Sequence, residues 1–263
     1  MDNNLLQVII LGVIEGITEF LPISSTGHLL IAEHWLGARS ELFNVAIQAG
    51  AILAIVLVYR QRLTDILLTN FGVASNRDYL LKLILATGIT GAGLLAVKKF
   101  GFELPTNVAP VAWALILGGV AILVVEFLVV KRIPSSYVTW NVAAWVGASQ
   151  ILAAVFPGTS RSAATIFAAM LAGTTSRPAA AEFAFLVGIP TMFGATAYEV
   201  YSVNKEGGLQ SVDWLSLGVG FAVSTVVAFI AVKWLLKYIQ THRFTAFAWY
   251  RIVFGVVLLA ILS

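Results

Sequence analysis

Two carboxylates stand one helical turn apart near the start of the chain. Glu15 and Glu19 belong to the segment LGVIEGITEFLP, which is otherwise almost wholly apolar. On a helix, residues four apart share one face, so the two like charges repel each other. A bound divalent cation, protonation of one carboxyl group or a basic partner from the other half of the chain would offset that repulsion. The alternative is a helix end that reaches water, with both carboxylates hydrated; we favour a functional site, because carboxylates inside apolar segments are costly.

Hydroxyl groups and an imidazole follow the carboxylates. The segment after Pro22 contains Ser24, Ser25, Thr26, Gly27 and His28. An aliphatic hydroxyl is a weak nucleophile until a base or an ion activates it, and His28 is near enough in sequence to act as base, acid or phosphate donor. The alternative is that the hydroxyls cap a helix beginning near Gly27, while His28 satisfies a carbonyl group. The residues by themselves leave both interpretations open.

A second polar break contains an arginine. It has the sequence PGTSRS, and the candidate phosphate-binding residues in and just after it are Gly158, Thr159, Ser160, Arg161, Ser162 and Thr165. An apolar helix is expected to begin near Ala163, and backbone N–H groups at a helix N-terminus point toward anions. The arginine fork binds two phosphate oxygens at once. The alternative is an interfacial arginine that reaches lipid headgroups; we favour phosphate binding, because Arg161 lies at a break rather than at the end of a span.

These polar groups are embedded in a strongly apolar chain. Of its 263 residues, 59% are hydrophobic and 11% are charged, against roughly 25% charged in a soluble domain. Apolar blocks such as Val111–Val130 and Trp214–Leu236 approach the about 20 residues that a helix needs to cross a bilayer. The chain contains no cysteine, which excludes disulfides and thiolate chemistry. Its net charge of +3 is too small and too dispersed to indicate nucleic-acid binding.

The apolar runs predict an all-α polytopic membrane protein with six full spans. We place these spans near residues 42–59, 80–98, 110–130, 182–202, 213–236 and 246–262. Two further apolar regions, 4–36 and 140–172, are each broken in the middle by proline and hydroxyl residues. Irregular backbone is tolerated in a membrane only where protein or a water-filled cavity satisfies its peptide groups. Both regions are therefore predicted to be re-entrant helix pairs.

The two broken regions resemble each other. An offset of 135 residues aligns five identical pairs: Gly12 with Gly147, Pro22 with Pro157, Ser25 with Ser160, Ile31 with Ile166 and Leu36 with Leu171. The same offset aligns Glu15 with Gln150. A single membrane domain, 1–263, is therefore predicted to contain two repeats, of about 1–130 and 135–263.

Charged residues outside the two breaks indicate the orientation of the chain. One predicted side carries Arg60, Arg62, Arg77, Lys82, Lys131, Arg132, Arg177, Lys237 and Arg243, and the other carries Arg39, Lys98, Lys99 and Lys205. By the positive-inside rule the first side is cytoplasmic, which places both termini outside. The re-entrant pairs then enter from opposite faces, the first from outside, as an inverted repeat with a site expected near the midplane. Glu126 is expected to pair with Lys131 or Arg132 near the interface.

Two motifs together resemble one bacterial enzyme family. EGITEFLPISSTGHL at Glu15–Leu29 and PGTSRSAAT at Pro157–Thr165 are similar to the motifs of the bacterial undecaprenyl-diphosphate phosphatases, which are associated with bacitracin resistance. The motifs have that family's order and separation, and the resemblance extends through RPAAAEFAFLVGIPTM and most of the chain. It implies removal of the terminal phosphate from a C55 isoprenyl diphosphate in the bacterial inner membrane. The monophosphate carrier is then reused in peptidoglycan and other envelope synthesis.

The resemblance also implies roles for individual residues. Glu15 and Glu19 match the family's acidic motif and would hold a divalent cation, Mg²⁺ or Ca²⁺. Ser25 matches the proposed nucleophile, His28 the essential histidine and Arg161 the phosphate-binding arginine. The remaining motif residues are predicted to bind substrate: Ser24, Thr26, Gly27, Gly158, Thr159, Ser160, Ser162 and Thr165. Attack on phosphorus by serine, by histidine or by water stays open at this point.

A transporter is the strongest alternative function. Inverted repeats with broken helices near the midplane also occur in secondary transporters, so a polyprenyl-phosphate flippase or a secondary transporter is compatible with the same pattern. The predicted partners are a polyprenyl diphosphate substrate and membrane lipid, with no nucleic acid, and a homodimer is compatible with the sequence. Phosphate release in detergent, without any gradient, distinguishes an enzyme from a transporter.

Overall fold

The computed structural model describes residues 3–69, 73–100 and 108–262, and within these ranges the chain is helical and contains no strand. The α-helices are α1 (Asn3–Thr18), α2 (Ser25–Leu36), α3 (Glu41–Val58), α4 (Arg60–Thr64), α5 (Ala74–Lys99), α6 (Val108–Val129), α7 (Trp140–Val155), α8 (Arg161–Ala172), α9 (Arg177–Lys205), α10 (Trp214–Thr241) and α11 (Thr245–Leu262). A π-helical turn, Asp65–Thr69, follows α4, and a 3₁₀ turn, Gly208–Ser211, precedes α10. The all-α prediction is confirmed for these residues.

Five helices are long and apolar enough to cross a membrane: α3, α5, α6, α9 and α10. They lie where five of the six spans are predicted. The sixth predicted span, 246–262, is also an apolar helix, α11, but its stretch Thr245–Ala260 is shorter than the others. The chain is therefore a multi-pass membrane protein, with five spans supported by length and composition.

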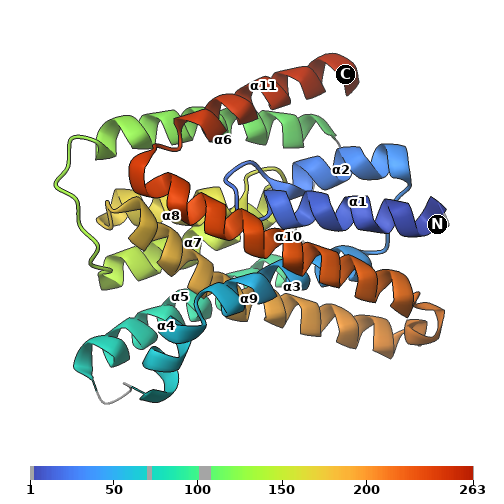
Figure 1. Ribbon diagram of the computed structural model, residues 1–263, viewed down its shortest axis with the longest axis horizontal. Helices are drawn as coiled ribbons and strands as arrows, with labels where there is room; N and C mark the ends of the chain where they lie inside the picture. The colour runs from blue at the N-terminus through green and yellow to red at the C-terminus, as the bar shows by residue number, and fades with distance from the viewer. Residues whose placement is uncertain (1–2, 70–72, 101–107, 263) are drawn as a thin grey trace.

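Two helical hairpins meet tip to tip in the middle of the molecule. The regions predicted to be broken form the pairs α1/α2 and α7/α8, and the segments between the paired helices, 19–24 and 156–160, are the tips. Figure 1 shows α1 and α2 extending from the centre toward the end where the N-terminus lies, and α7 and α8 extending toward the opposite end. The C-terminus lies at the same end as the N-terminus (Figure 1).

The first helix of each hairpin packs on a long helix from the other half of the chain. α1 lies along α10, and α7 lies along α5. A Cβ added to Gly12 would stand 2.9 Å from the Gly220 carbonyl oxygen, and one added to Gly147 would stand 2.6 Å from the Ala86 carbonyl oxygen. Small residues let helix backbones approach closely in membranes, where packing drives association. The two glycines that the 135-residue offset aligns therefore play the same packing role.

The 135-residue offset is wrong beyond the tips. Ser24 caps α2 and Ser160 caps α8, and these two caps are 136 positions apart. Both have positive φ, 74° and 69°, and no other non-glycine residue among those described does. The structural counterpart of Ser160 is therefore Ser24, not Ser25, because the cap geometry, rather than residue identity, defines the equivalent position.

A buried ion pair joins α6 to α9 and to the residue that precedes α11. Glu126 in α6 accepts hydrogen bonds from Arg177 Nε at 2.8 Å and Nη2 at 2.5 Å, and from the Phe244 backbone N–H at 2.9 Å. The prediction that Glu126 pairs with Lys131 or Arg132 is therefore wrong. Arg177 starts α9 and presents a planar fork to a carboxylate that is 2% exposed.

Candidate active site

One carboxylate joins the two hairpin tips. Ser25 Oγ donates to Glu19 Oε2 at 2.5 Å, and Arg161 Nη2 donates to Glu19 Oε1 at 2.7 Å. Ser25 is the first residue of α2, and Arg161 is the first residue of α8. Glu19, which lies in the first tip, is 6% exposed. The structure thus brings Glu19, Ser25 and Arg161 together, and the basic partner predicted from the other half of the chain is Arg161.

The local sequence explains why both helices begin at this point. Ser24 Oγ accepts from the Gly27 N–H, and Ser160 Oγ accepts from the Ala163 N–H, so a serine caps each helix. A serine at the cap satisfies one of the otherwise unpaired N–H groups of the first turn. The positive φ of each cap serine costs on the order of 1–3 kcal/mol and persists only where the surroundings impose it. The capping alternative is therefore correct for Ser24, whereas Ser25 faces Glu19.

A polar cavity of about 450 Å³ lies against both tips. It is lined by Glu19, Ser25, Thr26, Glu41, Asn44, Val45, Gln48, Thr90, Leu94, Gln150, Ala153, Ala154, Pro157, Gly158, Ser160, Arg161, Thr191 and Ala195. The first turns of α2 and α8 both border it, so two helix N-termini contribute partial positive charge to one cavity. Together with the Arg161 guanidinium, they are the groups of this cavity that can attract an anion, whereas Glu19 and Glu41 bring carboxylates to the same lining.

Glu15 is a buried carboxylate that could be a metal ligand. Its side chain is fully buried, and neither carboxylate oxygen has a hydrogen-bond partner among the described residues. The hydrated-carboxylate alternative is therefore wrong for Glu15. The charged groups that act on it are Glu19 and Arg161.

The described residues contain no group of three or more His, Cys, Asp or Glu side chains that could hold a metal. Mg²⁺, however, commonly uses only one or two carboxylates plus substrate phosphates and water. Glu15 and Glu19 are donors of that kind, but both Glu19 oxygens already accept hydrogen bonds and Glu15 does not line the cavity.

Comparison with known proteins assigns the family. A family model described as "Bacitracin resistance protein BacA" matches residues 8–257. The chain belongs to the BacA family. A Rhizobium johnstonii protein named "Undecaprenyl-diphosphatase" is 61% identical over 250 residues, covering 95% of this chain and 94% of its own. A Xanthomonas oryzae pv. oryzae protein of the same name is 55% identical over 257 residues, covering 98% and 97%. The BacA match covers both tips, the second hairpin and the first hairpin from residue 8 onward.

His28 lies outside the cavity of this BacA-family protein. Its Nδ1 donates to the Ser24 carbonyl oxygen at 2.7 Å, and its Nε2 is 2.6 Å from Tyr250 Oη. The ring stacks on Phe254 with centroids 4.4 Å apart. Because Nδ1 keeps its proton and donates it in the hydrogen bond to the carbonyl oxygen, Nε2 of a neutral imidazole has no proton and accepts from the tyrosine hydroxyl. The structure therefore does not pair His28 with Ser25, and the hydrogen-bonded neighbour of Ser25 is Glu19.

The remaining predicted binding residues divide between the cavity and the backbone. Thr26, Gly158 and Ser160 border the cavity. Five predicted residues do not line it: Ser24, Gly27, Thr159, Ser162 and Thr165. Thr165 Oγ1 donates to the Arg161 carbonyl oxygen at 2.7 Å, and Ser162 Oγ donates to the Leu21 carbonyl oxygen at 3.1 Å. The second of these bonds ties α8 to the first tip, so Ser162 positions the site.

Two further residues belong to the BacA-family site although the sequence does not predict a role for them there: Gln150, which the 135-residue offset only aligns with Glu15, and Arg251. Gln150 lines the cavity, its Oε1 accepts from Thr191 Oγ1 at 3.0 Å, and its buried Nε2 has no partner among the described residues. Arg251, in the middle of α11, is fully buried behind the tips. A charged residue inside the apolar run TAFAWYRIVFGVVLL is a signal that could have identified Arg251.

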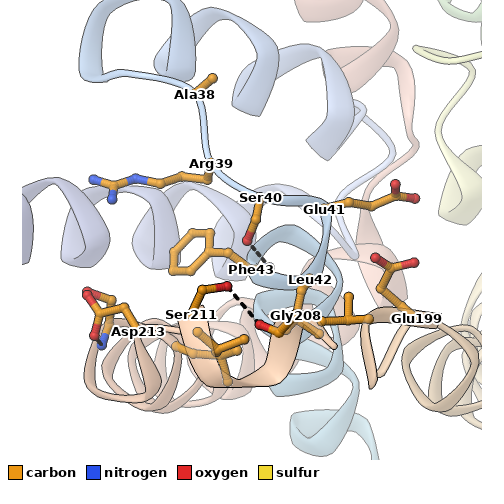
Figure 2. A pocket seen from close by; sticks show the side chains of 14 residues that line it. Ala38, Arg39, Ser40, Glu41, Leu42, Phe43, Glu199, Gly208, Ser211 and Asp213 are labelled. Atoms are coloured by element: carbon orange, nitrogen blue, oxygen red, sulfur yellow. Dashed lines mark hydrogen bonds between the residues drawn. The ribbon is translucent and has the colours of Figure 1, made fainter. Parts of the chain in front are cut away.

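A second cavity adjoins the first at the start of α3. It has a volume of about 400 Å³ and lies between the segment 38–43 and the start of α10 (Figure 2). Figure 2 shows the carboxylates of Glu41 and Glu199 on one side of this cavity, and Arg39 pointing away from them. Glu41 borders both cavities, but no residue of the two BacA-like motifs lines the second one. We therefore place the chemistry in the first cavity.

Proposed function

We propose that this protein is a membrane phosphatase that hydrolyses undecaprenyl diphosphate to undecaprenyl phosphate and inorganic phosphate. Its relatives with 55–61% identity bear the name of that activity, and BacA-family membership implies bacitracin resistance through return of the carrier to peptidoglycan synthesis. The observation that carries the proposal is the contact of Glu19 with both Ser25 and Arg161 beside a polar cavity. A hydroxyl nucleophile, an acceptor for its proton and an anion-binding group thus share one site among apolar helices.

Arg161 and the two helix N-termini bind the diphosphate in this proposal. Arg161 uses Nη2 for Glu19, and its other N–H groups have no partner among the described residues, so they are free for phosphate oxygens. The charge-assisted bonds of a guanidinium to phosphate are about twice as strong as neutral ones. The isoprenoid chain lies between apolar helices, because only lipid or protein surface suits it.

Ser25 attacks the terminal phosphorus, and Glu19 is its base. Ser25 Oγ forms the new P–O bond, its proton passes to Glu19 Oε2, and the bond from the terminal phosphorus to the bridging oxygen breaks. Glu19 then gives the proton to the bridging oxygen of the departing undecaprenyl phosphate. Water attacks the phosphoserine, Glu19 takes the water proton and returns it to Ser25 Oγ, and inorganic phosphate leaves. The 2.5 Å contact of Ser25 with Glu19 favours this base over His28, which is bonded to Tyr250.

A divalent cation, Mg²⁺ or Ca²⁺, is proposed at Glu15 and Glu19. The support is the pair of buried Glu15 oxygens that lack any partner in the described part of the chain. When bound, such an ion neutralises charge on the phosphoryl oxygens. Addition of a chelator should therefore lower phosphate release, and added Mg²⁺ or Ca²⁺ should restore it.

We further propose six spans and two re-entrant hairpins in the bacterial inner membrane, as an inverted repeat of about 1–130 and 135–263. The sparse basic residues near the ends of α5 and α9, Lys98, Lys99 and Lys205, support an outer location for that end and for both termini. The start of α3 and the later parts of α5 and α9 border the cavity, through Glu41, Leu94 and Ala195. The cavity would thus open outward. A homodimer stays a prediction.

Purified protein in detergent, supplied with a C55 diphosphate, tests the proposed function. Release of inorganic phosphate is expected without any gradient, and loss of most release is expected in Ser25→Ala and Arg161→Ala. A transporter would release no phosphate under these conditions. Trapping a phosphoryl group on Ser25 would support covalent catalysis, whereas near-normal turnover in both variants would reject the site.

A further inference from the structure

Arg251 bonds to both tips at once from a fully buried position. Its five hydrogen bonds go to Leu115 O at 3.3 Å from Nε, to Pro22 O at 3.3 Å and Thr159 O at 3.0 Å from Nη1, and to Ala114 O at 3.0 Å and Gly158 O at 3.1 Å from Nη2. A guanidinium has five N–H donors, so every donor is used. Pro22 belongs to the first tip, Gly158 and Thr159 belong to the second, and the other two carbonyls belong to α6.

We propose that Arg251 is a positioning residue for phosphoryl transfer: its guanidinium holds the peptide planes of both tips so that the Ser160 N–H faces the phosphate. This inference rests on the proposed function. Burial of an arginine without a carboxylate is costly unless its donors are fully satisfied. Arg251 forms no ion pair within the described ranges. Five carbonyls replace its hydration, so its positive charge is not neutralised beside the anion site.

The direction of the Ser160 N–H follows from the bond to Thr159. In a trans peptide the C=O and the next N–H point in opposite directions. The Thr159 carbonyl points at Arg251, so the Ser160 N–H points away from Arg251. Ser160 is also one of the residues that line the cavity. This N–H has no hydrogen-bond acceptor among the described residues, whereas the neighbouring Thr159 N–H donates to Phe156 O at 3.1 Å.

The backbone at the cap also requires an external support. Ser160 has φ 69° and ψ 111°, a conformation that serine rarely adopts. The adjacent carbonyls of Gly158 and Thr159 are both held by Arg251. Pro22, near the other positive-φ serine, is held by the same guanidinium. One side chain therefore constrains the backbone beside both strained caps.

Two substitutions can displace the guanidinium in different ways. Arg251→Lys keeps the charge but has three donors on one nitrogen, so it cannot hold five carbonyls in a plane. Gly118→Ala leaves Arg251 intact, but the new Cβ would stand 2.1 Å from its Nη2. Gly119→Ala is the matched control, because its Cβ would meet the Ala248 carbonyl oxygen and Ile252 Cγ1, both at 2.7 Å, in the same α6/α11 contact without touching Arg251.

The test measures kcat and KM for steady-state phosphate release from a C55 diphosphate in detergent, with each rate divided by the amount of folded protein. We expect Arg251→Lys to lower kcat about 100-fold, as loss of an oxyanion donor does, with KM changed by less than about threefold. Gly118→Ala should lower kcat at least about tenfold, and the double variant should match Arg251→Lys alone, because the added methyl then has no guanidinium to displace. Gly119→Ala should lower kcat much less than Gly118→Ala, because its methyl group shifts the same α6/α11 contact without reaching the guanidinium.

Hydrogen exchange checks the geometry without turnover. The tips, residues 19–24 and 156–160, should exchange faster in Arg251→Lys and Gly118→Ala than in Gly119→Ala. The proposal is overturned by unchanged kcat in Arg251→Lys, by equal losses in Gly118→Ala and Gly119→Ala, or by additive losses in the double variant. Failure of the first two variants to fold while Gly119→Ala folds would assign Arg251 a purely structural role. An inactive unmodified protein would instead refute the proposed function, and the exchange data would still judge Arg251.

Discussion

Glu19→Gln separates proton transfer from binding at the site. The carboxylate accepts from Ser25 at 2.5 Å and from Arg161 at 2.7 Å, one bond on each oxygen. An amide has a single acceptor oxygen, so one of the two donors must lose its partner, and a neutral amide cannot take the serine proton. Loss of a general base typically costs about 10²–10⁴-fold in rate. Loss of the charge-assisted bond lowers the free energy of unfolding by no more than about 3 kcal/mol, because Arg161 is partly exposed and can be hydrated.

The assay is steady-state phosphate release together with thermal unfolding in the same detergent. We expect kcat to fall by about 10²–10⁴-fold while the folded protein persists. KM should change little or decrease, since Arg161 becomes free to bind phosphate. Glu182→Gln is the matched control, because Glu182 also pairs with an arginine, Arg62, at 3.2 Å, but does not line the cavity. If Glu19→Gln keeps more than about a tenth of the kcat, Glu19 is not the base.

Three further substitutions test other parts of the argument. Arg161→Lys should raise KM about tenfold more than it lowers kcat, because a point charge replaces a fork; equal changes in both constants would contradict this. Glu126→Ala should destabilise the protein by about 3–5 kcal/mol, measured by unfolding, because it leaves Arg177 without its buried partner. Hydrogen bonds from the Ser216 side chain and N–H lower the pKa of Asp213 below its ordinary value of 3.8. Asp213→Asn should therefore be less stable than the unmodified protein at neutral pH, and the difference should shrink as pH falls through and below 3.8.

Much of the site could be predicted because its residues lie at interruptions of an otherwise apolar pattern. Proline and hydroxyl residues near Pro22 and Pro157 predict both tips, and the helices do stop there. Glu19, Ser25 and Arg161 are costly or reactive groups at those breaks, and Glu19 contacts the other two. The short separation of His28 and Ser25 in the sequence predicts a contact that the structure does not show. A neighbour 222 positions away, Tyr250, holds the His28 ring instead.

The sequence alone determined that the protein lies in a membrane, that it is helical, where its helices break and to which family it belongs. These properties follow from local composition, because a helix satisfies its own backbone and a proline or a capping serine acts on its nearest neighbours. Only the tertiary structure decided the partners: Glu126 with Arg177, and Arg251 with five carbonyls. Such pairings depend on which helices pack together across gaps of 51 to more than 200 residues. In a chain with few charges, every buried polar group must find whichever partner that packing brings within reach.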